Sequence, residues 1–488
     1  MYTNALYIGV FVAYFAVFIG IGIYQGRKVK SEEDYAIAGR DLPGWAAALS
    51  ERATGESSWA LIGLPGWAYA VGVNCVWVLV GCLVGIFIAW FFLAERLRKA
   101  AAKYDAVSFV DLIAKMHPGM GKPIRVASSS LILFFFFFYV GAQFLGGGKV
   151  FETMFGISPQ IGMLLTMLII IPYTVYGGFQ SVVYTDCVQG VLMIVALVVA
   201  PLIGVFVLKD MTGVYANGII EALTMAGPSY TSLTGGAVGF AAVLIVLDGF
   251  SWFFGYLGGT PQLSMRFMAI KDTDNVKFGR NLGIIWTVVA YAGTLIIGYL
   301  GIALWGPTGL TDPESVFPRV MMEFFHPAVA ALFIVAAFAA LISTADSLLV
   351  LASNEFSENI FMPYFAKKGT NNLFVSRLST ALIAVVALGS TFILPSNLIY
   401  NIIGYVWAGI GCPFSVVVLL SFFWSKFSSK AALSTIIGGM LFTIFWVTSG
   451  LDGEIFTARA VSFFVSLAIG VVVSYMAPRT EEEVLQVA

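Results

Sequence analysis

Two apolar stretches of the chain carry oxygen-bearing groups that suit a cation. The first, Ala53 to Ser58, combines a glycine, hydroxyls and a carboxylate. The second contains Ser343 and Ser347, one helical turn apart, and Asp346 lies on the same face of that helix. Hydroxyl, carboxylate and carbonyl oxygens are hard ligands of the kind that suits Na⁺. Both stretches are therefore candidate cation sites.

A packing interpretation is the alternative for each stretch. The first can be a helix kink filled with small residues, and the serines of the second can bond the preceding turn while small residues let helices approach closely. Neither explanation accounts for Asp346, because a carboxylate inside a membrane span is a functional hypothesis by default.

Other charged positions stay open from the sequence. Asp186 can reach the same cation from below, or its carboxylate can satisfy a helix N-terminus. Glu51 and Arg52 can form a local ion pair. Asp248 is an acid without an assigned partner.

Several other chemistries have little support. The four cysteines lie in apolar segments without CxxC spacing, and His117 and His326 stand near span ends, so neither a disulfide framework nor a zinc site is expected. A net charge of −1 argues against a nucleic-acid partner. An enzyme is not expected, since the sequence offers no paired nucleophile and base and no phosphate loop in a strand-to-helix context.

The elements that must position these residues are membrane helices. Of the 488 residues, 59% are hydrophobic and 11% are charged. Apolar runs of about 20 residues recur, and each can cross a hydrocarbon core of roughly 30 Å. The stretch Ala5 to Ile23 leads into Arg27-Lys28-Val29-Lys30 rather than a cleavage site, so we interpret it as a retained first span. We expect one multi-pass domain, 1–488, in the lipid of the cell (inner) membrane.

We predict thirteen all-α transmembrane spans, with the N-terminus outside and the C-terminus inside. In this orientation 21 of the 26 Lys and Arg residues fall on cytoplasmic segments, as the positive-inside rule requires, and the tail 478–488 is cytoplasmic. The spans are 4–26, 44–72, 74–95, 126–153, 158–178, 183–208, 236–259, 282–305, 327–354, 378–395, 398–424, 431–450 and 458–476.

This arrangement admits two five-span units in opposite orientation, 44–208 and 236–424. Both units open on a span with helix-breaking sequence, Thr54-Gly55-Glu56-Ser57-Ser58 in the first and Gly255 to Pro261 in the second. In transporters with inverted repeats, broken helices in matching positions point to the binding site.

A series of short motifs runs along nearly the whole chain. They are Asp34-Tyr35-Ala36-Ile37-Ala38-Gly39-Arg40, Ala48-Leu49-Ser50, Trp59, Gly63-Leu64-Pro65-Gly66, Tyr176-Gly177-Gly178-Phe179, Tyr184-Thr185-Asp186 with Gln189, Arg266-Phe267-Met268-Ala269, and Ser343-Thr344. In this order they resemble the sodium:solute symporter family, and most of all its sodium/proline symporters.

The resemblance implies a LeuT-like fold with a 5+5 inverted repeat, alternating access and Na⁺ as coupling ion. The sodium site it implies uses carbonyls of Ala53, Glu56 and Ala340 and hydroxyls of Ser343 and Thr344. A second cation position seen in some relatives maps to Asp186, Ser343, Asp346 and Ser347. The substrate region maps to Ser57, Tyr139, Trp252, Tyr256 and Pro261, the last through a one-residue insertion.

One departure from the family pattern concerns the broken part of the second span. Where proline symporters place an aspartate and a methionine, this chain has Gly55 and Glu56. The carboxylate has moved by one residue, about 100° around a regular helix. Asp346 adds a carboxylate where a neutral residue is common, so protonation of Glu56 or Asp346 can supplement or replace sodium coupling.

The leading hypothesis is Na⁺-coupled uptake of a small zwitterion, L-proline. Alternatives within the class are symport of another amino acid, a betaine, a carboxylate or a sugar, coupled to Na⁺ or H⁺. A transporter-like sensor would need a signalling output, and Pro478 to Ala488 is too short for a kinase domain. A channel suits broken helices with discrete oxygen ligands less well than a carrier does.

Overall fold

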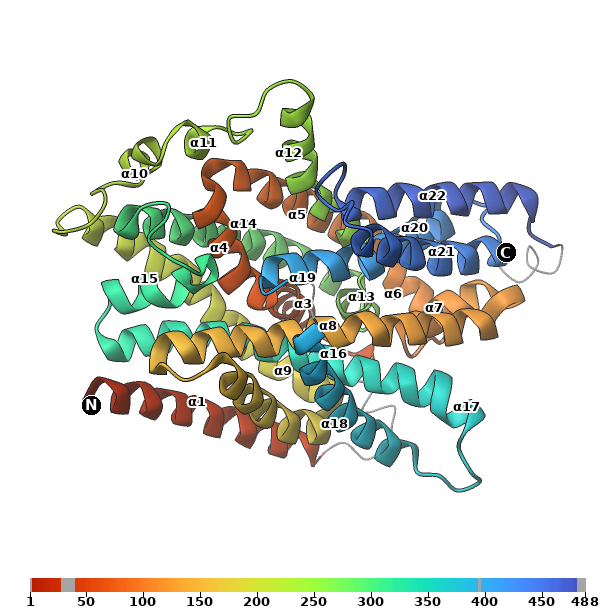
Figure 1. The fold of residues 1–488 in the computed structure, drawn as a ribbon. Helices are drawn as coiled ribbons and strands as arrows, with labels where there is room; N and C mark the ends of the chain where they lie inside the picture. The colour runs from red at the N-terminus through yellow and green to blue at the C-terminus, as the bar shows by residue number, and fades with distance from the viewer. Residues whose placement is uncertain (1, 28–39, 394–395, 481–488) are drawn as a thin grey trace.

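The computed structural model describes residues 2–27, 40–393 and 396–480, which form a bundle of long helices (Figure 1). Regular structure in these ranges is helical, apart from two isolated β-bridges. The start of α1 and the end of α22 lie at opposite ends of the bundle (Figure 1). Residues 34–39 of the opening motif, the basic positions Lys28 and Lys30, and residues 481–488 of the predicted tail lie outside the described residues.

The helices follow one another along the chain with short connections. Their bounds are α1 Tyr2–Gly26, α3 Gly44–Ser58, α4 Leu64–Val71, α5 Val76–Ile88, α6 Ala94–Lys103, α7 Phe109–Met116, α8 Gly121–Phe155, α9 Pro159–Leu208, α10 Ile219–Ala226, α11 Pro228–Thr231, α12 Phe240–Phe250, α13 Pro261–Met268, α14 Thr273–Trp305, α15 Val316–Phe324, α16 Pro327–Phe356, α17 Met362–Tyr364, α18 Asn372–Ser390, α19 Ile399–Val406, α20 Cys412–Phe423, α21 Ser429–Thr448 and α22 Ala458–Met476.

By length and composition, nine helical stretches of the described residues can cross a membrane, and a bent pair, Phe240–Tyr256 with Pro261–Met268, makes a tenth. A shorter apolar helix, Ala5–Ile21, coincides with the predicted first span. Two of the nine, Gly44–Lys103 and Pro159–Leu208, each cover two predicted spans.

Both of these long stretches break at a glycine where two predicted spans meet. Gly72 has φ +69° and Gly178 has φ +65°, a left-handed backbone that glycine adopts without steric penalty. These two predicted boundaries therefore agree with the structure, while the count of thirteen, the N-outside orientation and the five-span units stay predictions.

Both broken helices predicted from the sequence are present. In α3 the backbone leaves helical geometry at Ser57, with φ +54° and ψ −168°. A left-handed residue that is not glycine costs of order 1–3 kcal/mol and persists only where its surroundings fix it. The second break lies between the 3₁₀ segment Ser251–Tyr256 and α13, where the chain bends by 42°.

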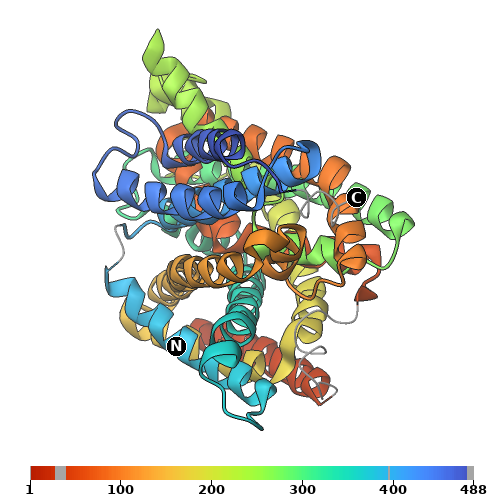
Figure 2. The same ribbon diagram turned by 90° about the vertical axis from the view of Figure 1, so that its right-hand side faces the viewer.

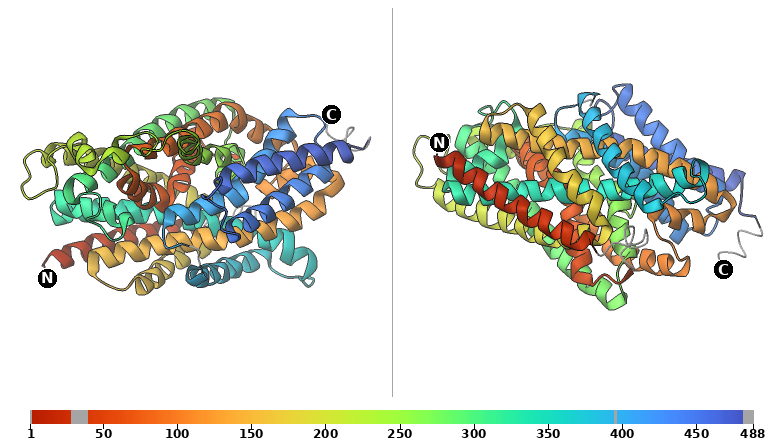
Figure 3. Two further views of the ribbon diagram at one scale, coloured as in Figure 1. Left: turned by 45° about the horizontal axis from the view of Figure 1, so that its top comes forward. Right: turned by 90° about the horizontal axis from the view of Figure 1, so that it is seen from below.

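The helix α16 forms the centre of the bundle. It packs against α3, α8 and α9, and its alanine-rich middle is buried on all sides. Viewed from the end, other helices surround it (Figure 2). Helix α1 lies along one outer face of the bundle against α9 and α16, and α21 and α22 pair on another face (Figure 3). The two broken segments thus meet the buried middle of α16.

Candidate cation and solute site

Two hydroxyls of α16 contact the broken region of α3. Ser343 Oγ lies 3.1 Å from the carbonyl oxygen of Ala53 and 2.9 Å from that of Ala340. Thr344 Oγ1 lies 2.9 Å from the carbonyl oxygen of Thr54 and 3.1 Å from that of Ala340. All five residues are fully buried. The structure therefore brings together four of the expected sodium-site residues and adds the carbonyl of Thr54.

Glu56, the fifth expected residue, makes different contacts. Its carbonyl oxygen accepts a hydrogen bond from the Trp59 backbone N–H. Its carboxylate lies 3.0 Å from Arg52 Nη1, and Arg52 also pairs with Glu51. The local ion pair considered from the sequence is thus present, and Glu56 extends it. Within the described ranges, Glu56 Oε2 has no hydrogen-bond partner.

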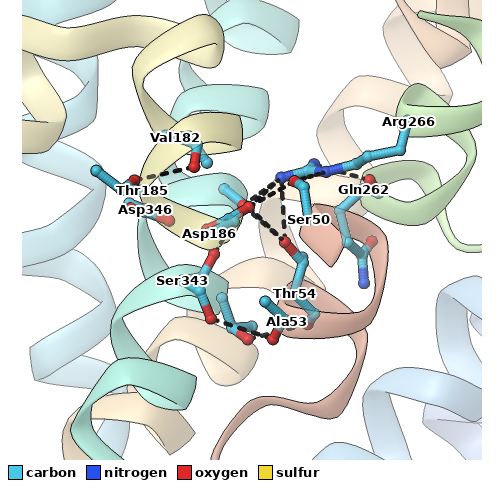
Figure 4. A network of polar contacts seen from close by, with 12 residues as sticks. Ser50, Ala53, Thr54, Val182, Thr185, Asp186, Gln262, Arg266, Ser343 and Asp346 are labelled. Atoms are coloured by element: carbon cyan, nitrogen blue, oxygen red, sulfur yellow. Dashed lines mark hydrogen bonds and ion pairs between the residues drawn. The ribbon is translucent and has the colours of Figure 1, made fainter. Parts of the chain in front are cut away.

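Beside the hydroxyls lies a polar network centred on Arg266 of α13 (Figure 4). Its Nη2 lies 3.2 Å from Asp186 Oδ2, 2.6 Å from Ser347 Oγ and 3.1 Å from Thr54 Oγ1. Its Nε donates to Ser50 Oγ at 3.1 Å, and that hydroxyl donates to Asp186 Oδ2 at 2.7 Å. One guanidinium therefore links α13 to α3, α9 and α16.

Asp186 and Ser347, two residues of the expected second cation position, contact this guanidinium. A buried ion pair is stable when further hydrogen bonds satisfy its remaining atoms. The hydroxyls of Ser50 and Thr54 both donate to Asp186 Oδ2, while Asp186 Oδ1 has no hydrogen-bond partner among the described residues. Asp346 has a different partner, since its Oδ2 accepts from the Tyr173 hydroxyl at 3.1 Å. Its Oδ1 has no hydrogen-bond partner in the part of the chain that the structure describes.

Aromatic side chains form the second part of the site. Trp407, in the π-helical turn between α19 and α20, is surrounded by three of the expected substrate residues. Its ring centroid lies 6.1 Å from that of Tyr139, 6.1 Å from that of Trp252 and 5.1 Å from that of Tyr256. Trp59 packs on Trp252 at 4.6 Å. We call these five residues the aromatic cluster.

Several polar atoms of this region are buried without a hydrogen-bond partner among the residues described. They are Ser58 Oγ, Trp59 Nε1, Tyr139 OH and Trp407 Nε1. An unsatisfied buried donor or acceptor costs about 1–3 kcal/mol, and native proteins contain few of them. A small ligand with both apolar and polar groups would satisfy such a cluster.

The other two expected substrate residues lie at the two helix breaks. Ser57 Oγ accepts a hydrogen bond from the Trp59 backbone N–H at 3.0 Å. Pro261 is the first residue of α13. A backbone N–H at this position would have no partner within the helix, so proline fits there without loss of a hydrogen bond.

An aromatic layer lies between the cluster and a cavity of about 610 Å³. Trp252 Nε1 donates to the Tyr400 hydroxyl at 3.1 Å, and the Tyr400 ring stacks on Trp67 with centroids 4.7 Å apart. Trp67 and Tyr400 both line the cavity, which lies on the predicted outer side.

Asp248, which the sequence left unexplained, pairs with Arg459 of α22 in the wall of this cavity. The two side chains are 2.9 Å apart, and Arg459 Nε donates to Ser251 Oγ at 2.8 Å. The guanidinium carbon of Arg459 also lies 4.5 Å from the centroid of the Trp252 ring. A helix outside the predicted repeat units thereby contacts Trp252, an expected substrate residue.

Three important residues were not identified as site residues from the sequence. Arg266 entered only as part of a motif and as a cytoplasmic positive charge, although a basic residue five positions after Pro261 in a broken span was a signal. Trp407 and Arg459 carried no local signal, because their partners lie far away in the chain.

The chain is similar to known proteins over most of its length. The model of the sodium:solute symporter family matches residues 35–439. The osmoregulated proline transporter OpuE of Bacillus subtilis is 30% identical over 472 residues, covering 96% of this chain and 94% of the relative. The high-affinity proline transporter PutP of the same organism is 31% identical over 459 residues, covering 92% and 95%.

A third relative is sodium/proline symporter 2 of Staphylococcus saprophyticus, 31% identical over 445 residues, covering 89% of this chain and 85% of the relative. Among solved structures, a Na⁺-coupled sialic acid symporter in a substrate-bound outward-open state aligns with a TM-score of 0.79 at 18% identity, covering 97% of this chain and 98% of that one. The shared fold confirms the LeuT-like expectation for this multi-pass membrane protein. The chain belongs to the sodium:solute symporter family.

Proposed function

We propose that this protein carries L-proline into the cell together with Na⁺ by alternating access. The single observation that carries the proposal is the contact of the Ser343 and Thr344 hydroxyls with the carbonyls of Ala53 and Thr54, beside the break at Ser57. The relatives named as proline transporters support proline as the solute.

Sodium fits this donor set, because hydroxyl and carbonyl oxygens are hard ligands and all of them are buried. A cation between these oxygens would hold α3 against α16. Because Ser57 lies in the last turn of α3 and Trp59 follows that helix directly, the same contact would fix the backbone next to the aromatic cluster. Coupling then follows, since each ligand stabilises the conformation that the other one binds.

Both the apolar ring and the charged groups of proline suit the aromatic cluster. Its apolar ring matches the faces of Trp252 and Tyr256, and aromatic rings attract the positive edge of a secondary ammonium. Its carboxylate would accept from the unpartnered donors Trp59 Nε1, Tyr139 OH and Trp407 Nε1.

The conformation supports access from the predicted outer side. The cavity of about 610 Å³ reaches the aromatic layer from that side. On the predicted inner side, Arg266 and its hydrogen bonds tie α13 to α3, α9 and α16. Inward release would require that these contacts separate.

Proton coupling is the second candidate. It is favoured by two buried carboxylate oxygens, Glu56 Oε2 and Asp346 Oδ1, that lack hydrogen-bond partners in residues 2–27, 40–393 and 396–480. A proton on either group would remove its buried charge.

The test is solute uptake into proteoliposomes under imposed Na⁺ or H⁺ gradients, with proline, other amino acids, a betaine, a carboxylate and a sugar compared. The double variant Ser343→Ala and Thr344→Ala should abolish Na⁺-dependent proline uptake. Ser353→Ala is the matched control, because Ser353 is buried on the same helix and bonds only the Val350 carbonyl. Full uptake by the double variant would refute the sodium site, and accumulation driven by H⁺ alone would favour the second candidate.

A further inference from the structure

Glu355, near the C-terminal end of α16, is a buried carboxylate that the proposed function does not use. Its side chain is almost fully buried, and its Oε2 accepts from Ser129 Oγ at 3.0 Å and from Asn359 Nδ2 at 2.6 Å. Lys115 and Arg125 pair with Asp111, and Arg266, which lines a small cavity together with Glu355, pairs with Asp186. Over the described parts of the chain, Glu355 forms no ion pair and its Oε1 has no hydrogen-bond partner.

An isolated buried carboxylate is unfavourable, because its charge has lost water and gained no cation. Ser129 and Asn359 are neutral and stabilise the charge only in part. An ionisable group inside a membrane span is by default a candidate functional site.

A small cavity adjoins Glu355. Its volume is about 10 Å³, near the lower limit for one water molecule or an ion of similar size. The lining includes Ser108, Arg266, Ser347, Asn354 and Glu355. Asn354 Oδ1 is also buried and has no hydrogen-bond partner within the described residues. Two unsatisfied oxygens therefore lie in the wall of one cavity of ionic size.

We propose that this cavity is a release site for Na⁺, with Glu355 and Asn354 as its ligands. The proposal rests on Na⁺ coupling and extends it to the predicted cytoplasmic side of Arg266. A carboxylate and an amide oxygen are hard ligands, as Na⁺ requires, and the cavity is too small for a proline molecule.

The geometry of α16 connects this cavity with the upper site. Ser343 and Ser347 lie one helical turn apart on α16, and Glu355 follows about two turns after Ser347, roughly 80° further around the helix. The distance from Ser343 to Glu355 is about 18 Å along the helix axis. Ser347 connects the two sites, because its hydroxyl donates to the Ser343 carbonyl and its side chain also lines the cavity.

Arg266 stands between the two sites. Its guanidinium bonds Ser347 and Asp186 above and lines the cavity below. In this conformation a positive charge blocks the route of a cation. Movement of α13 would withdraw that charge and let Na⁺ pass from the upper oxygens to Glu355.

The experiment compares Na⁺ affinities on the two sides of the membrane. Proline uptake by the full chain is measured in oriented membrane vesicles while internal Na⁺ is varied, and then while external Na⁺ is varied. Glu355→Gln should raise the internal Na⁺ concentration that half-inhibits uptake by about tenfold, a loss of one ligand interaction, and leave the external half-saturating concentration unchanged. Asn354→Leu should shift internal inhibition in the same direction.

The control is Glu358→Gln, an exposed acid of the following turn that should change neither value. Equal shifts on both sides, or no shift in either variant, would overturn the proposal. Inhibition of the wild type by internal acidification, in place of internal Na⁺, would overturn it in favour of a proton at Glu355.

A binding test keeps the inference separate from the proposed function. In the Ser343→Ala and Thr344→Ala background, thermal unfolding is followed in detergent with NaCl or KCl. A Na⁺-specific stabilisation that disappears on adding Glu355→Gln supports the release site. Its absence in that background contradicts the site. Uptake by the wild type that ignores external Na⁺ would instead refute the proposed function.

Discussion

Arg266 Nη2 lies 3.2 Å from Asp186 Oδ2, and both side chains are at most 1% exposed. Removing one partner of a buried pair leaves an uncompensated charge and costs about 3–5 kcal/mol. Arg266→Gln alone and Asp186→Asn alone should each lower the free energy of unfolding by an amount of this order. The double variant should lose clearly less than the sum, as measured by thermal unfolding in detergent. Strict additivity would mean that the two charges do not stabilise each other.

Gly255→Ala should disrupt the aromatic cluster. A Cβ at this position would overlap the indole ring of Trp407. Overpacking of this kind forces side chains to move and costs about 1–3 kcal/mol. We therefore expect proline uptake to fall at least about tenfold. Gly389→Ala is the control, since a Cβ there meets nothing within 4 Å. Comparable losses in both variants would show that the effect is not specific to the cluster.

Arg459→Met should weaken solute binding from the outer cavity. The substitution removes the ion pair with Asp248 and the positive charge over the Trp252 ring. A cation–π contact at a partly desolvated site contributes about 1–2 kcal/mol. The KM for proline should rise about tenfold with the Na⁺ dependence unchanged. Arg319→Met, an exposed arginine of α15 on the predicted outer side, should leave KM as it is. A change in Na⁺ affinity instead of proline affinity would argue against this role.

The pair of Arg40 and Asp105 predicts a pH dependence of stability. Arg40 Nη2 lies 2.6 Å from Asp105 Oδ1, and this hydrogen bond, with the charge of Arg40, holds the pKa of the Asp105 carboxyl below its usual value. A lowered carboxyl pKa stabilises the folded state above the unfolded pKa of about 3.9, and the effect is lost as the pH falls through the folded pKa.

Asp105→Asn should therefore unfold at a lower temperature than the wild type at neutral pH. The difference should shrink to zero as the pH is lowered below about 4, as followed by melting curves across pH. If the difference in melting temperature did not change with pH, it would come from the backbone of residue 105, which has φ +48°, and not from the ion pair.

The breaks in both helices were predictable because local sequence determines them. Gly55 and the polar residues around it cannot face lipid, and the run Gly258-Gly259-Thr260-Pro261 combines glycine and proline, the residues that most often end a helix. Helical spacing singled out Ser343 together with Asp346 and Ser347, whereas Thr344 was expected only from the resemblance to the family.

Partners that are distant in the chain were not predictable in the same way. The sequence could not decide whether Glu56 faces the cation oxygens or Arg52, because the break at Ser57 changes the rotation of the backbone there. Trp407 and Arg459 meet Trp252 only through the packing of three separate helices. Asp186 was predicted as a cation ligand, and its contact with Arg266 depends on where α13 docks.

The hydroxyls of Ser343 and Thr344 have a consequence for ion release. Each has one proton, yet each lies within hydrogen-bond distance of two carbonyl oxygens. Two hydroxyl protons are thus available to three carbonyl oxygens, each with two lone pairs. The acceptors in this site therefore outnumber the hydroxyl donors. When an ion leaves, rotation of a hydroxyl can therefore direct its O–H to a carbonyl oxygen that the ion had contacted, so that this oxygen keeps a partner. We expect this exchange to keep the barrier to release low.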